Sequence, residues 1–204
     1  MIQVDISREI KRYNGLEELS FKADIASAAI TQISGPSGSG KTTLLRIIAG
    51  LVKPGRGLII ADGLTWLDTE NNINLPTQLR NVGFVFQDYA LFPNMTVEQH
   101  LNYGTKDADF VERLLALGRM ESFRNQKPLH LSGGQQQRLS ILRALSTNPR
   151  LILMDEPFSA LDRKLKDELI PELKAFFTEM KTTCLIVSHH PLELEGIASQ
   201  VLEL

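Results

Sequence analysis

The stretch GPSGSGKT, residues 35–42, has glycines, hydroxyl residues and one lysine at the spacing G-x-x-x-x-G-K-[ST]. This spacing is typical of a loop whose backbone N–H groups surround phosphate oxygens at the start of a helix. We expect Lys41 to reach the β- and γ-phosphates of a nucleotide and Thr42 to offer its hydroxyl to Mg²⁺. The remaining phosphate contacts are expected from Gly35, Pro36, Ser37, Gly38, Ser39, Gly40 and Thr43.

A pair of carboxylates in LILMDEP, residues 151–157, supplies groups that the loop lacks. Asp155 leaves an apolar strand where its side chain can hold the Mg²⁺ shell, and Glu156 follows where it can take a proton from an attacking water. The two stretches together predict hydrolysis of a nucleoside triphosphate. Because no NKxD-type guanine-reading motif is present, ATP is the expected nucleotide. Tyr13 could stack on adenine, or it could be an ordinary turn aromatic.

The elements that must position these groups are indicated by hydrophobic periodicity. Polar residues 65–78 are predicted to form a loop. Alternating or continuous apolar runs predict strands at 2–6, 19–25, 29–34, 57–63, 82–86, 151–154 and 182–188. Helical patterns cover 41–50, 96–119, 133–145 and 163–180.

Apolar strands that alternate with helices predict an α/β fold with a P-loop NTPase core around a mostly parallel, buried sheet. The half-exposed first strands predict an antiparallel β part at the N-terminus. Ligands of such sheets bind at the carboxyl ends of the strands, where the glycine loop, Gln87, the Asp-Glu pair and His189 would converge. We expect one domain over 1–204, in which 1–87 and 149–204 form the core and 88–148 a helical subdomain.

Composition excludes several classes of protein. A net charge of -2 offers no electrostatic support for nucleic acid as a partner. The single cysteine, Cys184, cannot form an internal disulfide, which favours a reducing cytosol. The charged N-terminal residues are unlike a signal peptide, and no apolar run approaches the roughly 18 residues of a membrane span. If the protein works at a membrane, we expect it to do so on the cytoplasmic face, through a partner.

The stretch LSGGQQQR covers residues 131–138. Its first five residues, LSGGQ, contain no metal ligand, no nucleophile and no obvious acid or base. The chain contains, in this order, GPSGSGKTT, LSGGQQQR, LILMDEP, SALD and SHH. With these motifs it resembles the ATP-binding cassette ATPase family over nearly the whole chain. The resemblance implies a homodimer that clamps two ATP molecules head to tail. Ser132, Gly133, Gly134 and Gln135 would then offer a hydroxyl, bare backbone N–H groups and a helix N-terminus to the nucleotide of the other subunit.

The same resemblance implies roles at four further positions. Gln87 resembles the hinge glutamine that senses Mg²⁺ and the γ-phosphate, and Asp162 resembles the aspartate that communicates between the two sites. His189 matches the histidine that contacts the γ-phosphate. His190 stands where an aspartate is common, so we interpret it as a structural histidine.

The stretch from Phe86 to Gly104 resembles the solute-importer cassettes, most of all the molybdate-importer ATPases. This implies permease subunits in the membrane and a solute-binding protein as partners. Tyr89, Leu91 and Phe92 could receive the permease, or they could fill the core of the helical subdomain. An ATP-gated module without transport, a solitary NTPase and an ATPase for another solute remain as alternatives.

Overall fold

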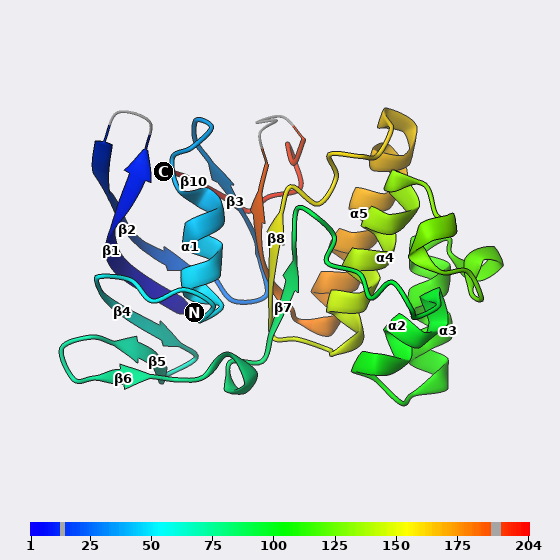
Figure 1. The fold of residues 1–204 in the computed structure, drawn as a ribbon, viewed down its shortest axis with the longest axis horizontal. Coiled ribbons are helices and arrows are strands. Elements are labelled where there is room, and N and C mark those ends of the chain that lie inside the picture. Colours follow the sequence, from blue (N-terminus) through cyan, green and yellow to red (C-terminus); the bar gives the residue numbers. More distant parts are fainter. Residues whose placement is uncertain (13–14, 189–192) are drawn as a thin grey trace.

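The computed structural model describes residues 1–12, 15–188 and 193–204, which form two five-stranded sheets and five α-helices (Figure 1). The antiparallel sheet, with the order β2-β1-β4-β5-β6, lies on the left in Figure 1. The parallel sheet, with the order β10-β3-β9-β8-β7, occupies the middle, and helices α2 to α5 lie on the right. This arrangement is the predicted α/β fold.

The bounds of the elements follow the chain. The strands are β1 (Ile2–Arg12), β2 (Gly15–Ile25), β3 (Ile30–Ser34), β4 (Arg56–Ala61), β5 (Leu64–Asp68), β6 (Ile73–Asn74), β7 (Val82–Val85), β8 (Leu151–Asp155), β9 (Thr183–Val187) and β10 (Gln200–Glu203). The α-helices are α1 (Lys41–Ile48), α2 (Val97–Gly104), α3 (Ala108–Gly118), α4 (Gly133–Ser146) and α5 (Arg163–Met180). Short 3₁₀ turns cover Thr77–Leu79, Glu121–Phe123 and Pro128–His130.

The parallel sheet is buried on both faces, which explains its continuous apolar strands. In β8, Leu151 and Leu153 belong to the core shared with α1 and the antiparallel sheet. Their neighbours Ile152 and Met154 belong to the core shared with the helices. Successive side chains of a strand point to opposite faces, so one strand serves two cores.

Helix α1 lies between the two sheets and carries the phosphate loop at its N-terminus (Figure 1). Leu44, Leu45, Ile47 and Ile48 are each at most 1% exposed. Full burial of such a side chain contributes about 1.5–3 kcal/mol, so both sheets hold the helix firmly. The loop that precedes α1 therefore starts from a rigid strand and ends on a rigid helix.

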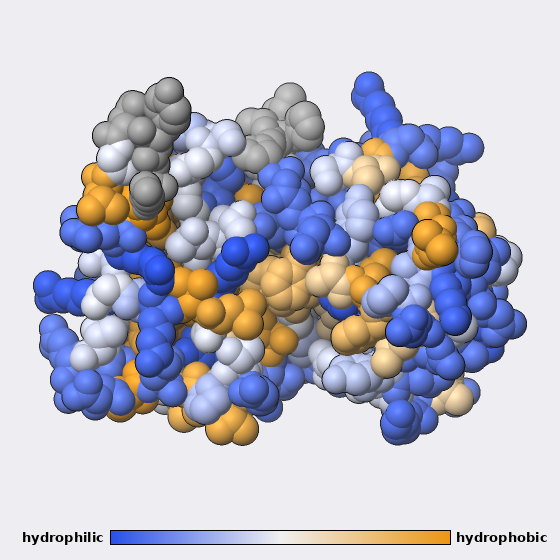
Figure 2. All heavy atoms as spheres, in the orientation of Figure 1, coloured by the Kyte–Doolittle hydropathy of each residue, from blue (hydrophilic) through white to orange (hydrophobic). Residues whose placement is uncertain are grey.

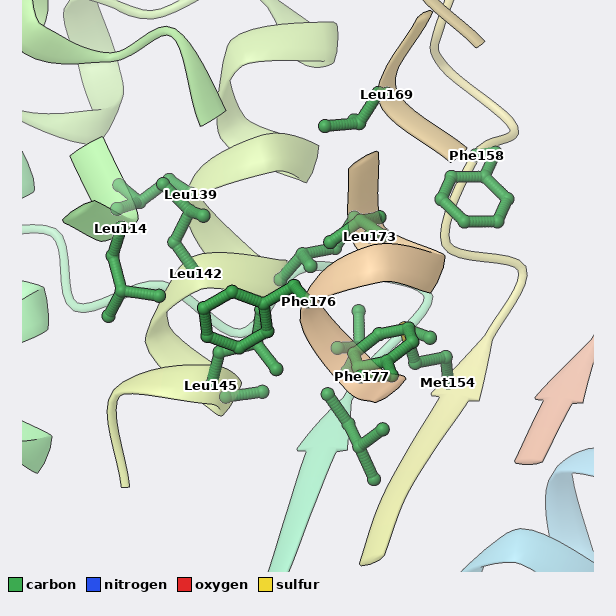
Figure 3. Packing of buried hydrophobic residues seen from close by; sticks show 14 of the residues in the cluster. Leu114, Leu139, Leu142, Leu145, Met154, Phe158, Leu169, Leu173, Phe176 and Phe177 are labelled. Atoms are coloured by element: carbon green, nitrogen blue, oxygen red, sulfur yellow. The ribbon is translucent and has the colours of Figure 1, made fainter. Parts of the chain in front are cut away.

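The helices on the other side of the parallel sheet share one apolar core (Figure 3). Phe176 and Phe177 of α5 are 5% and 3% exposed and lie among leucines of α3 and α4 and Met154 of β8. The outer face over α2 and α3 is mostly hydrophilic (Figure 2), as expected of amphipathic helices. No helix in the described ranges has the length and apolarity of a membrane span.

The structure differs from the sequence predictions at three places. The polar stretch 65–78 is not simply a loop, because β5 and β6 form there and bury Trp66 and Leu67. Strand β10 was not predicted, since its residues alternate between partial and full exposure and it pairs only with β3. The first hairpin is also longer than predicted, with its register running from Ile2 opposite Ile25 to Arg12 opposite Gly15.

Arg80 joins the end of α1 to the antiparallel sheet. Its guanidinium donates to the carbonyls of Ile47 and Ile48 at 3.1 and 2.8 Å, at the C-terminus of α1. It also donates to the carbonyl of Trp66 and the side chain of Asn74. Burial lowers the pKa of Arg80, but the side chain stays charged because arginine deprotonates only far above neutral pH. A positive charge is favourable at a helix C-terminus, and the guanidinium supplies side-chain donors to the last carbonyls of α1.

Candidate functional site

The phosphate loop occupies residues 35–40, where the C-terminal end of β3 turns into α1. Gly35, Gly38 and Gly40 have φ of 148°, 80° and 106°. Such angles are open to glycine and strained for other residues. Gly40 is the N-cap of α1 and makes no side-chain cap, so the helix N-terminus keeps backbone N–H groups for an anion.

Lys41, the first residue of α1, reaches back to the start of this loop. It is 5% exposed, and its Nζ donates to the carbonyls of Gly35 and Pro36 at 2.8 and 2.7 Å. Burial lowers the pKa of Lys41, while the negative charges of Glu156 and Asp155 raise it. Lys41 therefore lies between the carbonyls of the glycine loop and the carboxylates at the end of β8.

Thr42 and Asp155 bring a hydroxyl and a carboxylate together at the same strand ends. The Thr42 hydroxyl donates to Oδ2 of Asp155 at 2.8 Å, across 113 residues of sequence. Asp155 is 2% exposed at the end of β8. A hydroxyl oxygen from α1 and a carboxylate oxygen from β8 are thus held side by side.

Glu156 takes an unusual backbone conformation, with φ of 51°. Its N–H donates to the carbonyl of Val187 in β9 at 3.0 Å, so the neighbouring strand anchors it. Non-glycine residues at such angles are uncommon and concentrate at functional sites. Glu156 lines the pocket at the phosphate loop.

That pocket has a volume of about 320 Å³. Its lining residues are Ile10, Ser37, Gly38, Gly40, Lys41, Thr42, Thr43, Gln87, Glu156 and Val187. The predicted Gln87, which follows β7, therefore meets the phosphate loop and Glu156 in one place. A larger hollow of about 480 Å³ lies on the antiparallel sheet around Arg56 and Glu70, away from these motifs.

Ser132, Gly133, Gly134 and Gln135, the signature residues, do not line this pocket. Ser132 is the N-cap of α4 and forms a capping box with Gln135: its Oγ accepts from the Gln135 N–H at 3.3 Å, and Gln135 Oε1 accepts from the Ser132 N–H at 2.8 Å. Gly133 and Gly134 form the first turn of α4. The capping box explains where α4 begins. A Cβ on Gly134 would lie 3.1 Å from the Ala160 carbonyl oxygen, which favours glycine there, whereas a Cβ on Gly133 would meet the Tyr89 hydroxyl only at 3.9 Å.

Asp162 is the N-cap of α5, where its Oδ1 accepts from the Leu165 N–H at 2.9 Å. It is also outside the pocket lining. Tyr13, His189 and His190 lie outside the described residues, so their predicted roles stay predictions. Ile10, close to Tyr13 in sequence, lines the pocket, as does Val187, close to His189.

The stretch after Gln87 was expected either to receive the permease or to fill the core of the helical subdomain, and its residues differ in this respect. Leu91 packs against the helical core, whereas Phe92 is 37% exposed. The Phe92 ring lies 5.7 Å from the ring of His100 and 5.4 Å from that of Tyr103, which is itself 66% exposed. An aromatic surface therefore remains at Phe92 and Tyr103, with Tyr89 half-buried beside it in sequence.

Sequence reasoning missed Gln137, which contacts the residues around Glu156. Its side chain is 1% exposed although it is an amide on an otherwise apolar face of α4, with Ile141 and Leu145 at i+4 and i+8. A polar residue at a core position signals a buried hydrogen-bond network, because burying an amide without partners costs free energy. That signal was available in the sequence.

The parallel sheet, with a glycine loop between β3 and α1, has the fold of P-loop nucleoside triphosphatases. The chain belongs to the ABC transporter family, whose profile matches residues 16–159. The dimeric bacterial ABC transporter cassette MJ0796 has a TM-score of 0.83 and 32% identity, and the match covers 100% of this chain and 94% of that one. Its post-hydrolysis form bound to ADP and Pi has a TM-score of 0.82 and 31% identity, over the same shares of the two chains.

Two relatives are import ATP-binding proteins. The molybdenum import ATP-binding protein ModC 1 of Azotobacter vinelandii is 43% identical over 84% of this chain and 49% of its own length. The sulfate/thiosulfate import ATP-binding protein CysA of Synechocystis is 36% identical over 97% of this chain and 56% of its own length. The chain thus spans about half the length of the curated relatives it matches.

Proposed function

We propose that two copies of this chain bind and hydrolyse ATP at shared sites and so energise solute uptake through a separate permease. The observation that carries the proposal is the pocket in which Lys41, Thr42, Gln87 and Glu156 meet at the ends of parallel strands. A phosphate loop, a cation and a carboxylate in one pocket are the parts that phosphoryl transfer to water requires.

In this proposal, Glu156 is the general base. Its carboxylate accepts the proton of the attacking water, and Lys41 holds the β- and γ-phosphate oxygens. A general base contributes roughly 10²–10⁴-fold to turnover. His189 contacts the γ-phosphate, and Tyr13 stacks on the adenine.

The donor set fits Mg²⁺. Thr42 and Asp155 offer a hydroxyl and a carboxylate oxygen 2.8 Å apart. Gln87, whose side chain carries an amide oxygen, lines the same pocket as Thr42. Mg²⁺ prefers oxygen ligands and is commonly held by one or two carboxylates together with substrate phosphates. When bound, Mg²⁺ neutralises charge that develops on the phosphates.

The signature residues act on the other copy's nucleotide. Gly133 and Gly134 offer first-turn N–H groups at the start of a long helix, and they are separate from their own phosphate loop. A second copy arranged head to tail would supply the phosphate. The dimeric state of MJ0796 supports this arrangement. Asp162, which caps the helix after the Glu156 loop, links the two sites of the dimer.

The solute is an oxyanion, with molybdate as the first candidate, because relatives are named for molybdenum and for sulfate/thiosulfate import. The permease subunits contact the exposed aromatic surface of Phe92 and Tyr103, near Gln87 in sequence. The chain would then lie on the cytoplasmic face of the membrane, and a solute-binding protein would complete the system.

Uptake of labelled molybdate, sulfate and maltose in cells with and without this chain tests the proposal. Loss of molybdate uptake alone, restored by the wild-type chain and not by Lys41→Ala, is the expected result. Loss of sulfate uptake instead would keep the importer and change the solute. Unchanged uptake of every solute, together with ATP turnover that no permease stimulates, would overturn the importer.

A further inference from the structure

One side chain of α4 holds the loop that follows β8. We call α4 the signature helix, because it begins at the signature residues. Gln137 of α4 donates through Nε2 to the carbonyl of Glu156 at 2.9 Å and to the Ser159 hydroxyl at 3.2 Å. Its Oε1 accepts from the N–H of Ala160 at 2.8 Å. Both N–H groups of the amide and its oxygen are therefore used, and the reverse orientation would set an NH₂ group against the Ala160 N–H.

These bonds act on a strained residue. Glu156 has φ of 51°, a conformation that is strained for a non-glycine residue and persists only where its surroundings hold it. Its N–H is held by Val187 of β9 at 3.0 Å. Its carbonyl accepts from Gln137 and, inside the loop, from the Ser159 hydroxyl at 3.1 Å. Gln137 donates to this carbonyl from outside the loop.

The start of α4 also packs closely on the same loop. A Cβ placed on Gly134 would lie 3.1 Å from the Ala160 carbonyl oxygen, and one on Gly133 would lie 4.0 Å from the Ala160 Cβ. Gln137 stands one turn after Gly133 on the same helix. A movement of the signature helix would therefore pull directly on the backbone of Glu156.

We propose that Gln137 is a positioning residue for hydrolysis, which fixes the backbone turn of Glu156 and ties it to the signature helix of the same subunit. The inference rests on the proposed function of Glu156 as general base. A displacement of about 1 Å can cost on the order of 10²-fold in rate, so a carboxylate on a loosened turn loses most of its effect. ATP binding by the phosphate loop does not depend on these bonds.

The test replaces Gln137 with Met, which has a similar length and makes none of the three bonds. We expect kcat to fall about 10- to 100-fold, while KM and the affinity for nucleotide stay close to wild type. Because Ser159 is exposed, Ser159→Ala disturbs folding less than Gln137→Met does. It should lower kcat by a smaller factor than Gln137→Met. Thr182→Val removes another buried bond to a backbone carbonyl, at the opposite end of β9, and should leave kcat unchanged.

A double substitution separates positioning from general loosening of the fold. If Gln137 acts through Glu156, Gln137→Met should not lower the residual single-turnover rate of Glu156→Gln any further. An equal loss in both backgrounds, or wild-type kcat in Gln137→Met, would overturn the inference. Wild-type protein without ATP turnover would instead overturn the proposed function on which the inference rests.

Discussion

The two glycines at the start of α4 allow a test in which the effects on stability and activity have opposite signs. Gly133 is the better target, because a Cβ there meets the Tyr89 hydroxyl and the Ala160 Cβ only at 3.9 and 4.0 Å. At Gly134 the added atom would lie 3.1 Å from the Ala160 carbonyl oxygen and would disturb the chain's own fold. Gly133→Asp fits the monomer and places a negative charge where we expect the other copy's γ-phosphate.

The magnitudes follow from the helix position. An acidic residue in the first turn of a helix stabilises it by about 0.3–1 kcal/mol, so the melting temperature should stay the same or rise by up to roughly 4 °C. Two like charges about 4 Å apart at an effective dielectric constant of 20 repel by about 4 kcal/mol. If the transition state feels this repulsion, kcat falls on the order of 10³-fold.

The assay compares Gly133→Asp with Gly133→Asn, which has the same size and no charge. Steady-state ATP hydrolysis, nucleotide affinity of the monomer and thermal unfolding are measured for each. We expect a large loss of kcat for Asp, a smaller one for Asn, and unchanged affinity for both. Near-wild-type turnover in Gly133→Asp, or equal losses in the two variants, would refute the placement of a phosphate at this helix end.

Three further predictions concern other parts of the molecule. Arg80→Met should lower the free energy of unfolding by about 3 kcal/mol in a denaturant titration, because it removes the buried guanidinium bonds that join the end of α1 to Trp66 and Asn74; a change below 1 kcal/mol would contradict this role. Phe92→Ser should abolish stimulation of turnover by the permease without changing basal hydrolysis, and undiminished stimulation would argue against this docking surface. His189→Ala should impair hydrolysis much more than His190→Ala, and the reverse order would show that the two roles are exchanged.

Local sequence patterns were sufficient for most elements that carry the site. The helix predicted over 163–180 has the observed bounds, since Asp162 caps its first turn and its apolar face is long. The glycine loop was predictable because backbone geometry dictates its residues. By contrast, β10 has no strong periodicity, and it forms because β3 presents an edge to it.

Two parts of the candidate site depend on contacts that short patterns do not encode. The sequence marks Gln137 as an amide at a core position, but its partners lie 19 to 23 positions away and are set only when α4 packs on the loop after β8. The signature glycines have a local explanation as a helix start and no ligand within their own chain's pocket. Their proposed phosphate belongs to a second copy, which the fold of one chain cannot present.

The central claim, that two copies close around ATP, is tested most directly by the mass of Glu156→Gln in solution. This substitution keeps the shape of the side chain and removes the proposed base, so bound ATP should persist and hold two copies together. With ATP and Mg²⁺, light scattering should give about twice the chain mass of 22.8 kDa, returning to the single value without nucleotide or with Lys41→Ala added to the same chain. A single-chain mass under all conditions, or a Glu156→Gln protein that hydrolyses ATP at the wild-type rate, would contradict the claim.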